Sequence, residues 1–62
     1  MMTHTEKAVA AMQQLGGAFV EALAGAWLAA DPWNRARLEQ AFAPEFQKYA
    51  ELSRQAEPEM QP

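Results

Sequence analysis

The residues able to carry acid–base or nucleophilic chemistry are few and scattered along the chain. The single histidine, His4, lies near the N-terminus, and there is no cysteine, so thiolate and multi-histidine metal sites within one chain are excluded. Asp31 precedes a proline and suits helix capping better than acid catalysis. Ser53 has no histidine within reach in a helical fold, and Glu21 faces solvent. We therefore expect no catalytic residue, no metal site and no cofactor.

The charge balance argues against nucleic-acid binding. The net charge is −3, from eight acidic and five basic residues, whereas a nucleic-acid binder normally shows a basic face. Arg35 and Arg37 are two residues apart and so lie on different sides of a helix. A helix-turn-helix drawn through Ala43-Pro44 would have a proline in its turn. A small nucleic-acid-associated regulator, using Arg35, Arg37, Lys48 and Arg54, is kept as an alternative.

The elements that must position these residues are helices. Thr3 and Glu6 form a capping-box pattern, with Thr5 as the alternative cap. Apolar residues then recur at spacings of three and four without a proline, which predicts one long amphipathic helix over residues 4–30. Its stripe consists of Val9, Met12, Gly16, Phe19, Leu23, Ala26 and Ala30.

Two membrane-related interpretations of this first arm are considered. From Ala8 to Ala30 only Glu21 is charged, as in a signal peptide or a membrane span. Gln13 and Gln14 interrupt the run, however, and alanine and glycine supply little hydrophobic drive. We expect a cytoplasmic protein with no membrane segment.

Asp31-Pro32 is the sharpest boundary in the sequence. Proline disfavours helical geometry at the preceding residue, and the same pair makes a good N-cap and first helical position. Asp31 also stands four residues before Arg35, which predicts a surface ion pair. Helices are expected over residues 32–42 and 44–56, although a single helix kinked at Pro44 is the alternative.

The domain organisation follows from these helices. We expect residues 1–56 to form one helical domain and 57–62, with two prolines, to form a flexible C-terminal tail. The two arms are expected to fold into an antiparallel helical hairpin. Because a 62-residue chain buries little surface alone, we expect a dimer that resembles a four-helix bundle.

The glycines and aromatics supply the candidate contact residues. Gly16-Gly17 is either a bend or a notch that another backbone or an aromatic ring of the second arm can approach closely, and we favour the notch. Trp33, beside the break, either anchors a partner protein or covers the hairpin's own core. The full set for partner binding or self-association is Gly16, Phe19, Leu23, Trp27, Leu28, Trp33, Phe42, Phe46 and Tyr49.

One stretch resembles a known group of proteins. The run from Trp27 through Asp31-Pro32 and Arg37-Leu38-Glu39 to Phe42, continuing to Phe46 and Tyr49, is similar to small uncharacterised α-helical proteins of proteobacterial phages and prophages. That resemblance implies no defined activity and no site residues. It favours a small accessory protein, in the host cytoplasm, that inhibits or modulates a host protein or defence complex.

The sequence thus predicts a small protein-interaction module that binds a protein partner and itself. The alternatives are the nucleic-acid-associated regulator and a structural or assembly component that binds only itself.

Overall fold

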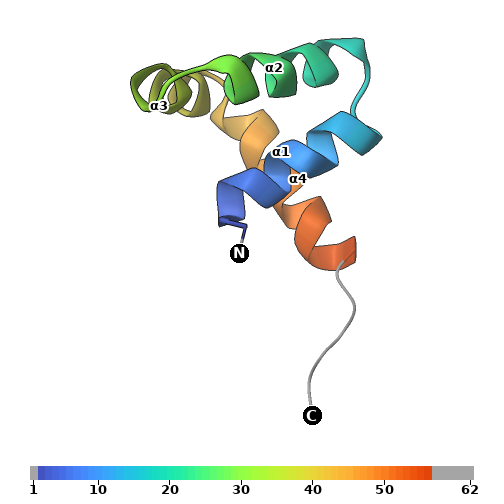
Figure 1. Ribbon diagram of the computed structural model, residues 1–62. Helices are drawn as coiled ribbons and strands as arrows, with labels where there is room; N and C mark the ends of the chain where they lie inside the picture. The colour runs from blue at the N-terminus through green and yellow to red at the C-terminus, as the bar shows by residue number, and fades with distance from the viewer. Residues whose placement is uncertain (1, 57–62) are drawn as a thin grey trace.

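Four α-helices make up residues 2–56, the part of the chain that the computed structural model describes (Figure 1). They are α1 (His4–Leu15), α2 (Ala18–Ala29), α3 (Pro32–Ala41) and α4 (Ala43–Ala56). Since these residues include no strand, the predicted all-α class is confirmed. None of these helices is both long and apolar enough to cross a membrane. The predicted tail, 57–62, lies outside the described residues.

The start of α1 is the predicted capping box. The amide of Glu6 donates to Thr3 Oγ1 at 3.0 Å, and the amide of Thr3 donates to Glu6 Oε1 at 2.7 Å. Two backbone donors that the first helical turn cannot satisfy are thereby paired. Thr3, rather than the alternative Thr5, is the N-cap.

The predicted long helix over residues 4–30 is wrong, because the chain breaks at Gly16-Gly17. Both glycines adopt extended backbone angles, with φ of −80° and −78°, and end α1 and begin α2. Each glycine inside a helix costs about 1 kcal/mol relative to alanine, so two in succession make this the cheapest place to interrupt the arm. The break lets α1 turn back and lie against both α2 and α4, with α1 crossing α4 below α2 in Figure 1.

The other two boundaries are where the sequence predicts them, within one residue. The carboxylate of Asp31 accepts a hydrogen bond from the amide of Asn34 at 2.8 Å, and Pro32 is the first residue of α3. Phe42 leaves helical geometry, with φ −119° and ψ 36°, and Pro44 lies in the first turn of α4. Two helices, not one kinked helix, therefore follow Asp31.

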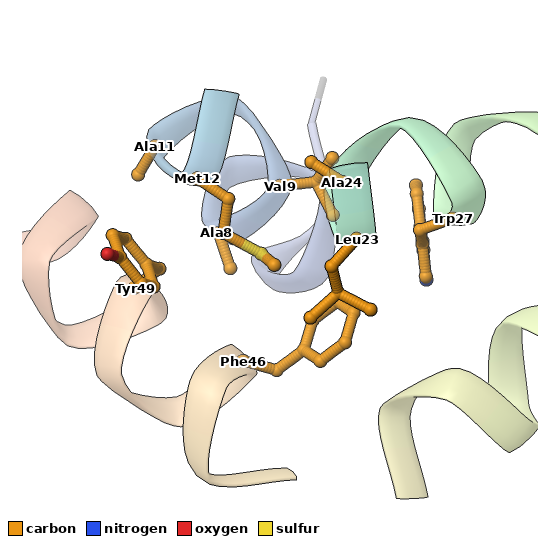
Figure 2. Packing of buried hydrophobic residues seen from close by; sticks show 9 residues of the cluster. All are labelled: Ala8, Val9, Ala11, Met12, Leu23, Ala24, Trp27, Phe46 and Tyr49. Atoms are coloured by element: carbon orange, nitrogen blue, oxygen red, sulfur yellow. The ribbon is translucent and has the colours of Figure 1, made fainter. Parts of the chain in front are cut away.

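The hydrophobic core lies between α1, α2 and α4 (Figure 2). Met12 and Val9 are its most deeply buried large side chains, and α3 contributes no buried residue. The break at the glycines is what brings Met12 between the other two helices, because a straight arm would leave part of its apolar stripe uncovered. The core comprises Ala8, Val9, Ala11, Met12, Leu23, Ala24, Trp27, Phe46 and Tyr49.

The two-armed hairpin is therefore replaced by a four-helix globule. The first and last helices do pack together, as a hairpin requires, but the first arm also packs against itself through α1 and α2.

Candidate interaction surface

Several large apolar side chains remain at the surface of the described residues. Trp33 is the most exposed, at 73%, followed by Leu15, Phe19, Met2 and Leu28. Scattered exposed apolar residues are normal in small proteins, but a tryptophan exposed to this degree is not. Trp33 therefore does not cover the core of its own chain, and that interpretation of the sequence is wrong.

Trp33 owes its exposure to the way α3 begins. Asp31 and Pro32 set the start of the helix, and Trp33 is its second residue, at the corner where α2 ends. Leu28, in the last turn of α2, is 48% exposed near the same corner. The corner thus presents two large apolar side chains, one from the end of α2 and one from the start of α3.

Polar contacts attach α3 to α2, in addition to the half-buried Leu38 of α3, which packs against the core. The indole Nε1–H of Trp27 donates to Glu39 Oε2 at 2.7 Å. The guanidinium of Arg35 lies 4.0 Å from the centroid of the Trp27 ring system and donates to the backbone carbonyls of Trp27 and Leu28, at 2.9 and 3.2 Å. Both carbonyls lie in the last turn of α2, where the Trp27 carbonyl also accepts from the Ala30 amide at 3.2 Å and the Leu28 carbonyl has passed the end of the helical ladder. Arg35 thus caps α2 and stacks on its tryptophan.

The predicted ion pair between Asp31 and Arg35 is replaced by these contacts. The Asp31 carboxylate caps α3, while the Arg35 guanidinium turns back to α2.

Because α3 meets α2 through Arg35 and Glu39, its opposite side is left free. We call this side the outer α3 face; it consists of Trp33, Ala36 and Gln40, spaced as one side of a helix and all exposed.

The structure separates the predicted contact residues into two groups. Leu23, Trp27, Phe46 and Tyr49 lie in the core, as Figure 2 shows. Phe19, Leu28 and Trp33 are exposed, and Phe42 is half-buried. The rings of Phe19 and Phe42 meet edge to face, with centroids 5.8 Å apart and an interplanar angle of 62°. Of the predicted contact residues with large side chains, only the three exposed ones and the exposed part of Phe42 can therefore meet a partner.

Gly16 does not form the notch that the sequence suggested. A Cβ at this position would stand 2.6 Å from the carbonyl oxygen of Met12 and closer still to the side chain of Val20. The groups that crowd Gly16 thus come from its own arm, not from an aromatic ring of the second arm. Its role is to bring α1 and α2 close together at the break.

The basic residues of the alternative nucleic-acid surface are divided among different contacts. Arg35 is turned inward onto Trp27, Arg54 pairs with Glu51, and Lys48 lies 5.5 Å from the centroid of the Tyr49 ring. Arg37 donates to the Asn34 side chain at 3.4 Å on its own helix. Each of these four cations therefore has a contact partner within the chain.

An open groove between α2 and α3 was not predicted from the sequence as a site. It has a volume of about 540 Å³ and opens because alanine side chains leave space between the helices. The small-residue surface of α2 was visible in the sequence, but its pairing with α3 was not. The lining residues are Ala26, Ala29, Ala30, Asn34, Arg37, Leu38 and Ala41.

Within residues 2–56 no three His, Asp or Glu side chains gather as a metal site would require. No family model matches the sequence, and no curated protein or solved structure shows a significant similarity to it.

Proposed function

We propose that this chain is a small non-enzymatic protein–protein interaction module that acts in the cytoplasm. Its contact surface is the corner between α2 and α3, and Trp33 is the anchor. The observation that carries this proposal is the 73% exposure of Trp33 on a helix that has no fully buried residue. Tryptophan is among the residues that dominate interface energies, and holding it on a helix lowers the entropy lost on binding.

The contacts of α3 support the same role. Since Arg35 and Glu39 hold the helix from its inner side, the outer α3 face can be covered by a partner without disturbing the core. Leu28 extends the apolar surface at the corner. Inhibition or modulation of a host protein or defence complex, as in phage accessory proteins, rests on the sequence resemblance alone.

Affinity capture with matched variants tests the proposal. The tagged wild-type chain, Trp33→Ala and Leu15→Ala are used as baits in lysate, and circular dichroism checks that each bait is folded. Leu15 is the control because it is also exposed but is the last residue of α1, beside the glycine break that precedes α2. A partner should be retained by the wild type and Leu15→Ala and lose about 30-fold in affinity with Trp33→Ala. Equal binding by all three baits would contradict this role for Trp33.

A further inference from the structure

The groove between α2 and α3 and the exposed ring of Phe19 lie on the same side of α2. Phe19, Ala22, Ala26 and Ala29 are spaced by three, four and three residues, so they share one helix face. Phe19 is 58% exposed, and its ring touches Phe42 at the far end of α3. Ala26 and Ala29 line the groove, which α3 closes on its other side. One face therefore carries a protruding ring at one end and a hollow at the other.

We propose that a second copy of this chain occupies the groove, so that two α2 helices pack antiparallel and each Phe19 ring enters the hollow of the other copy. Phe19 and Ala29 are ten residues apart, or about 15 Å along the helix axis. When two copies are related by a two-fold axis midway between these residues, Phe19 of each copy meets Ala29 of the other. Such an axis, perpendicular to the helices, keeps the α3 side of one copy on the α3 side of the other. The ring and the hollow therefore meet twice, as a closed two-fold interface requires.

The charges around the groove fit the same occupant. No acidic side chain lines it among the described residues, although the chain carries a net charge of −3. Glu21, the one charged residue of α2, is not among the lining residues. Two acidic chains can therefore meet here without burying carboxylates against each other. Arg37, the one charged residue of the lining, lies where a phenyl ring from the second copy would enter, and a guanidinium favours the face of such a ring.

The size of this face sets the expected strength. A surface about two helices wide and about 18 Å long buries on the order of 500 Å² per copy. The total of about 1,000 Å² is at the lower limit for a specific interface. The dimer should therefore form reversibly, with a dissociation constant in the micromolar range or weaker. This inference does not rest on Trp33, because the outer α3 face and the groove are formed by different residues.

Sedimentation equilibrium over a concentration series tests the dimer with three variants. Phe19→Ala removes the ring, and Ala29→Gln fills the hollow while leaving Phe19 in place. Leu15→Ala removes an exposed apolar side chain that does not line the groove. We expect the first two variants to weaken the wild-type dimer at least ten-fold and the third to leave it unchanged.

Circular dichroism checks that each variant is folded. If Phe19→Ala does not fold, the result for Ala29→Gln decides whether the groove forms the dimer interface. If the wild-type chain stays monomeric into the millimolar range, the proposal is overturned, because a second copy then does not occupy the groove. Unchanged association of both groove variants overturns it too.

Disulfide trapping tests the antiparallel arrangement separately, since the chain has no native cysteine. Ala22 and Ala26 are related by the same two-fold axis. A mixture of Ala22→Cys and Ala26→Cys chains should therefore cross-link faster than either variant alone. Faster cross-linking of identical variants would mean parallel helices and would overturn the arrangement.

Discussion

The indole nitrogen of Trp27 lies 2.7 Å from the carboxylate of Glu39, and this hydrogen bond joins a core residue of α2 to α3, a helix with no fully buried residue. Trp27 is only 5% exposed, so its N–H group cannot turn to water. Glu39 supplies the acceptor from α3, while Arg35 covers the ring. The tryptophan is thus both a core residue and the point where α3 is attached.

Removing the carboxylate of Glu39 should destabilise the fold. Glu39→Ala leaves a largely buried indole N–H without an acceptor, which we expect to lower the free energy of unfolding by about 1–3 kcal/mol. Glu39→Gln keeps an acceptor oxygen and should cost less. Urea unfolding followed by circular dichroism measures both, with Gln40→Ala, on the outer α3 face, as the control. Equal stability of Glu39→Ala and Gln40→Ala would show that the hydrogen bond contributes nothing.

The two glycines at the break should respond differently to substitution. Gly16→Ala places a methyl group against the Met12 carbonyl and the Val20 side chain, and we expect a loss on the order of 1–3 kcal/mol. A Cβ at Gly17 meets nothing within 4 Å, and Gly17 is the N-cap of α2 without a side-chain acceptor. Gly17→Ser should therefore raise stability by a few tenths of a kcal/mol. Thermal unfolding of the two variants measures the contrast, and similar losses at both positions would contradict it.

The capping box at the start of α1 predicts a contrast between two threonines. Thr3→Ala removes the oxygen that accepts from the Glu6 amide, which should cost about 1 kcal/mol. Thr5 lies inside the first turn, so Thr5→Ala should have little effect or stabilise the helix slightly. Chemical unfolding of both variants is the measurement. A larger loss of stability from Thr5→Ala than from Thr3→Ala would mean that Thr5, and not Thr3, is the N-cap.

Met12 should be the most sensitive position in the core. It is fully buried where α1 packs against α2 and α4. Met12→Ala should lower the free energy of unfolding by about 2–5 kcal/mol, enough to unfold a large fraction of the molecules of so small a protein. Leu15→Ala, three residues later on the exposed side of α1, should change stability by less than about 0.5 kcal/mol. Near-equal melting temperatures for the two variants would contradict the central place of Met12 in the core.

The sequence by itself determined the features that depend on neighbouring residues. The cap at Thr3, the boundary at Asp31-Pro32 and the separation of α3 from α4 near Pro44 are local hydrogen-bond and proline effects, and all three were predicted. The break at Gly16-Gly17 was missed because helical periodicity continues across it. The burial of Met12 in the core shared with α2 and α4 favours the bent arm, and this is a tertiary contact.

Tertiary structure alone decided which aromatic residues face outward and which pack inward. Helical spacing assigned Trp27 and Phe19 to one broad stripe, yet Trp27 is in the core and Phe19 is exposed. Both lie on α2 and point about 80° apart, and only the side that carries Trp27 is covered by the core. The bond from Trp27 to Glu39 spans twelve residues, and the groove requires α2 and α3 to lie side by side. Such contacts depend on how the helices pack, and helix periodicity carries no information about which face meets which.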